Sequence, residues 1–196
     1  MSVGIDLAGA PTRSTGFCRI DRRWTAETWV DHSDADIVRR CGEVAPAIIV
    51  VDAPLSLPRG RRTIGDRRGP HFRECDRELL RRRIPFFPIT LGPMRLLTRR
   101  GIRIKAALES RGLWTVEGYP GGAQDLWGIP RKGRGVERLR RGLRRFGVEG
   151  AVRHVSITHD ELDAVTLALV GLQILDGRAE ALGDPAEGLL YLPRRE

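Results

Sequence analysis

Acidic side chains occur at four points of the sequence where the chain is otherwise apolar. Asp6 and Asp52 each follow an apolar run, Glu117 ends a short strand-like segment, and Asp163 lies on the apolar face of a long helical segment. An ionised carboxylate in or beside a core is unfavourable unless a positive charge compensates it. Carboxylates that converge also repel one another unless a cation lies between them. The pattern therefore predicts a metal cage and favours metal-assisted chemistry.

The elements that must position these residues follow from the hydrophobic pattern. The first three strand-like runs are expected to form an antiparallel meander, whereas the later strands arrive through crossovers and should be parallel. Asp6 and Asp52 both stand at strand C-termini, where open α/β sheets bind ligands. The expected strands are 3–7, 15–20, 25–30, 47–51, 114–117 and 189–192, and the expected helices are 33–42, 73–83, 93–111, 135–146 and 158–176. Residues 118–122 are expected to form a turn.

The bulk composition indicates one folded domain over residues 1–196, with a basic helical insertion at 58–111. No apolar run approaches the roughly 20 residues of a membrane span, and no targeting segment is recognised, so we expect a cytoplasmic protein. The net charge of +9 suits an anionic partner such as nucleic acid. Lysine and arginine together number 34, and only Lys105 and Lys132 are lysines. The oligomeric state is left open.

Five short motifs, in this order, resemble the DUF429 family of predicted nucleases, a branch of the ribonuclease H-like fold. They are GIDLA at 4–8, VDAPLSLP at 51–58, RECD at 73–76, EGYP at 117–120 and DELDA at 160–164. The resemblance implies an α/β fold in which a mixed sheet, a three-strand meander plus parallel strands, is flanked by helices. It also implies that Asp6, Asp52, Asp160 and Asp163 hold two divalent metals, with Glu117 as a further candidate for the same cluster.

All-oxygen ligands suit hard cations, so the expected metal is Mg²⁺ or Mn²⁺. Two such ions, roughly 4 Å apart, activate a water and stabilise the leaving oxygen of a phosphodiester. In this hypothesis Asp6 bridges both metals, while Asp52 and Asp163 each hold one. Asp160 or Glu117 completes the shell or orients the water. The predicted protein is a nuclease that hydrolyses DNA or RNA by a two-metal carboxylate site.

Each candidate residue also has a structural interpretation. Asp6 and Asp52 are able to cap the turns that follow their strands, and Asp160 stands at a helix N-terminus, where acids satisfy free N–H groups. A structural role explains Asp163 less well, because it lies inside its helix on an apolar face. Arg73 and Asp76 are candidates for substrate binding, but their spacing also fits an i,i+3 ion pair on a solvated helix.

Two other functions remain open at this stage. A nucleic-acid-binding protein with a vestigial acidic cluster fits the basic composition equally well. An actin-like phosphotransferase shares the strand order, but residues 8–12 do not form a convincing phosphate-binding loop, and the chain is long enough for only one domain.

Overall fold

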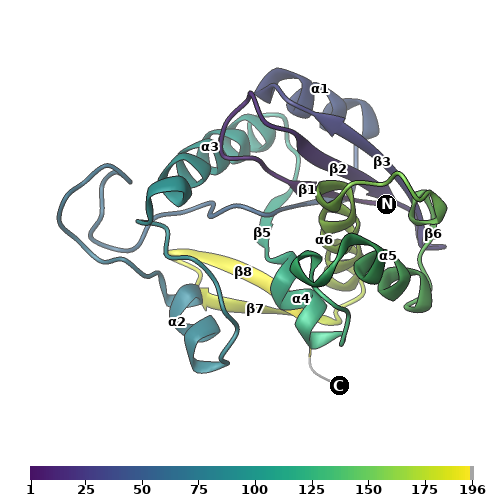
Figure 1. Ribbon diagram of the computed structural model, residues 1–196. Coiled ribbons are helices and arrows are strands. Elements are labelled where there is room, and N and C mark those ends of the chain that lie inside the picture. The colour runs from purple at the N-terminus through teal and green to yellow at the C-terminus, as the bar shows by residue number, and fades with distance from the viewer. Residues whose placement is uncertain (195–196) are drawn as a thin grey trace.

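The computed structural model describes residues 1–194, which form a mixed sheet covered by helices on both faces (Figure 1). The strands are β1 (Ser2–Asp6), β2 (Thr15–Ile20), β3 (Thr25–Asp31), β4 (Ile48–Val51), β5 (Thr115–Gly118), β6 (Glu149–Gly150), β7 (Ala179–Asp184) and β8 (Gly188–Pro193). The helices are α1 (Asp34–Val44), α2 (Glu74–Arg81), α3 (Gly92–Glu109), α4 (Pro120–Leu126), α5 (Val136–Arg145) and α6 (His159–Leu175), with short 3₁₀ turns at η1 (Lys132–Arg134) and η2 (Ala151–Arg153).

The strands lie side by side in the order β6-β3-β2-β1-β4-β5-β8-β7. β1, β2 and β3 are antiparallel neighbours, and β4 and β5 extend the sheet in parallel from β1. β8 is parallel to β5, and β7 closes the edge in an antiparallel hairpin with β8. The predicted meander followed by parallel strands is confirmed. β6 and β7 are additional strands that the hydrophobic pattern did not predict.

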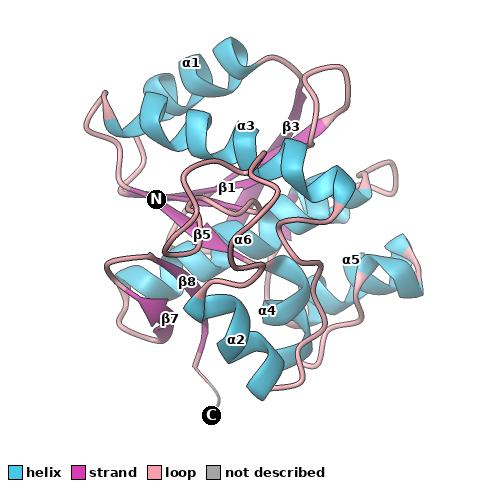
Figure 2. Cartoon of the chain, turned by 90° about the vertical axis from the view of Figure 1, so that its left-hand side faces the viewer, coloured by secondary structure: helices cyan, strands magenta, loops and turns pink. Residues whose placement is uncertain are grey.

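The helices form a layer on each face of the sheet. α1 and α3 cover one face and α6 covers the other, and Figure 2 shows α1 and α3 next to each other in the upper part of the view. Alternate residues of β1 supply the two cores: Ile5 packs under α1 and α3 with Ile37 and Ile104, whereas Gly4 faces α6. α6 is buried nearly all round, because the sheet covers one side and α4 and α5 cover much of the other.

Residues 58–111, expected as a basic helical insertion, lie between β4 and β5 and contain a loop, α2 and α3. α2 packs through Cys75 and Leu79 into the core that also holds Leu182 of β7. α3 instead covers the sheet face above β1 and β4. The turn predicted at residues 118–122 is wrong, because α4 begins at Pro120.

Candidate active site

Asp6 and Asp52 lie next to each other at the carboxyl edge of the sheet. Ile5 of β1 pairs with Val51 of parallel strand β4, and the backbone N–H of Asp52 donates to the carbonyl of Ile5 over 2.8 Å. This hydrogen bond continues the parallel ladder by one residue and places Asp52 beside Asp6. Asp6 is buried, and Asp52 is partly exposed.

Helix α6 brings Asp163 to the same edge. A Thr158–Glu161 capping box fixes the start of α6, and Asp163 follows in its second turn, buried against the sheet. Asp160, one turn earlier, lies at the rim of the site. Its carboxylate accepts from the Ser14 hydroxyl over 2.9 Å and lies 2.7 Å from Nδ1 of His159.

Two residues that sequence reasoning did not select also contact this cluster. Lys132 reaches in from η1, with its Nζ 2.7 Å from Oδ2 of Asp163 and 3.4 Å from Oδ2 of Asp6. Gln124 of α4 is buried and donates from Nε2 to Oδ1 of Asp163 over 2.7 Å. Both residues belong to the segment between β5 and α6, which crosses the carboxyl edge of the sheet.

The carboxylates of the cluster are electrostatically unfavourable together. Burial, and then the charge of Asp163, raise the pKa of Asp6 to about 7, although Lys132 opposes this shift. The pKa of Asp52 is raised well above its usual value, mainly by burial and then by Asp6 and Asp163. Burial disfavours the charged form of Lys132, but Asp6 and Asp163 outweigh it and raise its pKa. The cluster therefore carries negative charge that a single ammonium does not fully compensate.

Glu117, expected in the same cluster, lies elsewhere. It stands in register with Val51 and Ile5, and these two side chains enter the core under α1 and α3. Side chains in register across parallel strands share a face of the sheet, and successive residues alternate between faces. Glu117 therefore points away from the face on which Asp6 and Asp163 meet.

Glu117 instead accepts from a buried arginine. Its Oε2 accepts from Nη1 of Arg73 over 2.6 Å and from the backbone N–H of Leu55 over 2.8 Å, while its Oε1 accepts from Nη2 of Arg73 over 2.7 Å. Arg73 also binds Asp76 through two further hydrogen bonds. The expected Arg73–Asp76 pair is thus present, but it is buried rather than solvated, because it neutralises Glu117 beneath α2. A role of these residues in substrate binding stays a prediction.

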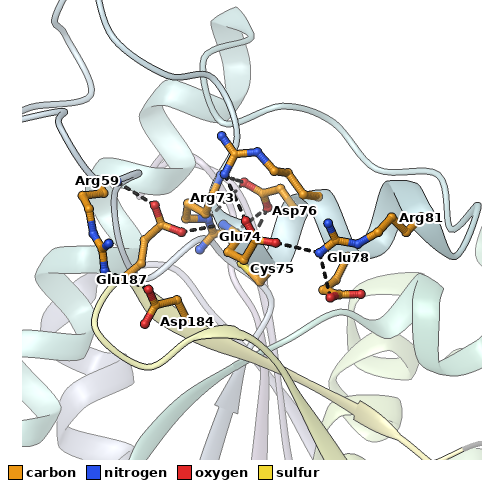
Figure 3. Close-up of polar contacts among 10 residues, drawn as sticks. Arg59, Arg73, Glu74, Cys75, Asp76, Glu78, Arg81, Asp184 and Glu187 are labelled. Atoms are coloured by element: carbon orange, nitrogen blue, oxygen red, sulfur yellow. Dashed lines mark hydrogen bonds and ion pairs between the residues drawn. The ribbon is translucent and has the colours of Figure 1, made fainter.

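The start of α2 is also tied to the β7–β8 turn, as Figure 3 shows. The Glu187 carboxylate accepts from the backbone N–H groups of Arg59 and Glu74, and the Arg59 side chain pairs with Asp184 over 2.8 Å. These contacts fix the segment that carries Arg73 and hold the insertion against the far edge of the sheet.

The chemistry of the cluster suits a hard divalent cation, because its donors are carboxylate oxygens with repelling charges. Among residues 1–194, however, no group of three or more His, Cys, Asp or Glu side chains is arranged to hold a metal ion. Both oxygens of Asp163 already accept N–H groups. Asp6 and Asp52 are therefore the acids of the cluster that keep carboxylate oxygens free for a cation, and metal binding by Asp6, Asp52, Asp160 and Asp163 together stays a prediction.

The sequence of residues 4–188 matches the model of a family described as "Protein of unknown function (DUF429)". The chain belongs to the DUF429 family. No curated protein matches this DUF429 chain. The family resemblance seen in the five motifs is thus confirmed over almost the whole length of the chain.

Among solved structures, this DUF429 protein is similar to RuvC of Thermus thermophilus. The two share 11% sequence identity with a TM-score of 0.50, and the match covers 90% of this chain and 96% of RuvC. A second match, T. thermophilus RuvC in complex with a Holliday junction substrate, has 12% identity, a TM-score of 0.47 and the same coverage. Together with the strand order, the first match shows that the expected ribonuclease H-like fold is present.

None of the helices in residues 1–194 combines the length and the hydrophobicity that a membrane-spanning helix requires.

Proposed function

We propose that this DUF429 protein is a metal-dependent nuclease with Asp6, Asp52 and Asp163 at its catalytic centre. The observation that carries this proposal is the meeting of three carboxylates, from β1, β4 and α6, at the carboxyl edge of a ribonuclease H-like sheet. Burying repelling charges lowers stability, and proteins tolerate such an arrangement mainly at functional sites.

The residues of the cluster have different roles in this proposal. Asp6 and Asp52 offer carboxylate oxygens to a divalent cation, and Mg²⁺ or Mn²⁺ suits such donors. When bound, this cation polarises a phosphoryl oxygen and promotes the ionisation of water. Gln124 fixes the orientation of Asp163, which in turn holds Lys132.

The loop at residues 58–72, which is rich in arginine, supports nucleic acid as the substrate. The chain leaves β4 at Asp52, and the loop at 58–72 is folded by the buried Arg61, which donates to the carbonyls of Asp66, Gly69 and Pro70. The loop projects from the body of the protein (Figure 1) and exposes Arg62, Arg67 and Arg68. Such guanidinium groups suit a phosphate backbone, whether DNA or RNA.

Aromatic side chains beside Asp52 support the same substrate class. A cavity of about 150 Å³ opens there and is lined in part by Phe86, Phe87 and Tyr119. The Phe87 ring is 68% exposed, so its face is accessible to a ligand. Aromatic faces beside a phosphodiester site are suited to stacking on unpaired bases.

Manganese binding and cleavage by carboxylate variants test this proposal. Asp6→Asn and Asp52→Asn should each weaken Mn²⁺ binding and lower cleavage of labelled DNA or RNA by at least about 100-fold, because each removes a charged ligand. The substrate panel should contain single strands, duplexes and four-way junctions. Neither variant should lower the melting temperature, because both replace a carboxylate whose ionised form is disfavoured by burial.

Asp176→Asn is the matched control, because Asp176 is an exposed aspartate at the far end of α6 that pairs with Arg22. It should behave like the wild type in both assays. If the wild type bound nucleic acid tightly but cut nothing in Mn²⁺ or Mg²⁺, the protein would be a binding protein with a vestigial cluster.

A further inference from the structure

Lys132 places a positive charge inside the carboxylate cluster from a segment that is held in position. The residue before it, Arg131, donates to Asp125 of α4 over 2.9 Å and to the hydroxyl of Tyr119 over 2.9 Å. The 3₁₀ turn η1 then starts at Lys132 itself. The ammonium thus reaches Asp6 and Asp163 from an anchored backbone rather than from a free surface loop.

The acids around Lys132 differ in how many oxygens are left for a metal. Within residues 1–194, Asp163 accepts from Gln124 on one oxygen and contacts Lys132 with the other, and both oxygens of Asp160 and of Glu117 also have partners. Asp6 contacts Lys132 through Oδ2 alone, at the longer distance of 3.4 Å. The oxygens that remain for a cation are therefore those of Asp52 and Oδ1 of Asp6.

The charge of the cluster also indicates how many divalent cations it can hold. Asp6, Asp52 and Asp163 carry three negative charges when ionised, and Lys132 compensates one of them. Two negative charges are left, and one divalent cation neutralises them. A second divalent cation in the presence of Lys132 would give these four side chains and the two ions an excess of positive charge.

We propose that this site works with one divalent cation, held by Asp6 and Asp52, and that the ammonium of Lys132 takes the place of the second. This inference rests on the proposed nuclease function and replaces the two-metal arrangement expected from the sequence. Lys132 then stabilises negative charge that develops on the phosphate during hydrolysis. Asp163 and Gln124 act as positioning residues for the ammonium and do not bind the metal.

A lysine suits this role better than the arginines that dominate the basic residues of the chain. An ammonium is a compact charge with three N–H donors on a flexible stem, whereas a guanidinium is a planar fork that favours bidentate pairing with one carboxylate. Two donors of Lys132 reach carboxylates on different elements, which leaves the third for a substrate oxygen. In a chain with only two lysines, one of them stands at the cluster.

Manganese stoichiometry tests this inference without depending on turnover. Free Mn²⁺ is followed by electron paramagnetic resonance during titration of the wild type, Lys132→Met, Lys132→Arg and Lys105→Met. The wild type should bind one Mn²⁺ per chain at the cluster. Lys132→Met should bind the first ion about 10- to 100-fold more tightly and take up a second, because a repelling charge has been removed.

Lys105→Met is the matched control, because the only other lysine lies on α3 and pairs with Glu109. It should not differ from the wild type. Lys132→Arg keeps the charge and should keep the stoichiometry of one. Cleavage by Lys132→Met should fall about 100-fold at low Mn²⁺ and depend on the square of the Mn²⁺ concentration, whereas the wild type should show a first-order dependence.

The one-metal inference would be overturned if the wild type bound two Mn²⁺ ions and Asp6→Asn lost both of them. Unchanged Mn²⁺ binding in Lys132→Met would also overturn it. Either result would leave the nuclease proposal standing. A wild type that binds no Mn²⁺ at this cluster would overturn both. The two failures are thereby distinguished.

Discussion

At the scale of single residues, Arg73 is the most consequential charge outside the carboxylate cluster. It is 2% exposed and neutralises two buried acids, Glu117 and Asp76. Burial disfavours the charge of Arg73, but the two carboxylates outweigh burial and raise the pKa of the guanidinium well above its usual value. Arg73 thus lets two acids lie in the interior close to the active site without adding to its excess of negative charge.

Removing this guanidinium should therefore be strongly destabilising. We expect Arg73→Met to lower the free energy of unfolding by about 3–5 kcal/mol, because it leaves Glu117 and Asp76 buried and uncompensated. Urea unfolding measures this change. Arg77→Met is the control on the same helix: Arg77 is exposed and, among the described residues 1–194, pairs only with Glu74, so its loss should change stability by less than about 1 kcal/mol. Equal effects of the two substitutions would contradict the buried-triad account.

The acidic residues show which parts of the site a sequence reveals. Asp6 and Asp52 were predictable, because each ends an apolar run and both runs are strands of one sheet. The separation of Glu117 followed from strand register, which the sequence does not show: a shift of one residue moves a side chain to the other face. Lys132 and Gln124 lie in no sequence motif that indicates a site. The rarity of lysine in this chain was the one signal that could have pointed to Lys132.

At the scale of elements, the site depends on how closely α6 lies on β1. A Cβ at Gly4 would stand 2.0 Å from the carbonyl oxygen of Ala164 and 2.5 Å from the backbone nitrogen of Ala168. These are backbone atoms of α6, so they cannot rotate away as a side chain does. Glycine at this position sets the distance between β1, which carries Asp6, and α6, which carries Asp163.

Gly4→Ala should thus displace α6 and disrupt the cluster. We expect it to lower the free energy of unfolding by about 3 kcal/mol or more, through overpacking against backbone that cannot yield. Gly42→Ala in α1 is the control, because within residues 1–194 its added Cβ would meet no atom within 4 Å apart from its chain neighbours and its own helix backbone; it should be neutral or stabilising by up to about 1 kcal/mol. Thermal and urea unfolding of both variants measure the difference, and a Gly4→Ala protein as stable as Gly42→Ala would refute the close-packing argument.

The elements that the sequence did not predict have physical explanations. α4 begins with Pro120 and two glycines, which have poor helix propensity, so a turn was expected. The structure requires a small residue at Gly122, whose added Cβ would lie 2.9 Å from the ring of Tyr119. The sequence of β7, AEALGD, contains no β-branched or aromatic residue, and it becomes a strand by pairing with β8.

At the scale of the whole molecule, the order of strands and helices was sufficient to predict the architecture. Rules for meanders and crossovers leave few arrangements for this order, and the observed sheet follows them. The similarity to RuvC agrees with that architecture and, at 11% identity, describes the fold alone. The function proposed for this DUF429 protein therefore depends on its own side chains: the carboxylate cluster, its lysine and the exposed arginines.

Anomalous diffraction from crystals soaked in Mn²⁺ tests the central claim most directly, because it locates the ion without requiring a known substrate. The account predicts an anomalous peak within coordination distance of the Asp6 and Asp52 carboxylates, with Lys132 still in contact with Asp163. Mn²⁺ bound only elsewhere on the protein, with no peak at Asp6 and Asp52, would contradict the claim that these acids form a metal site.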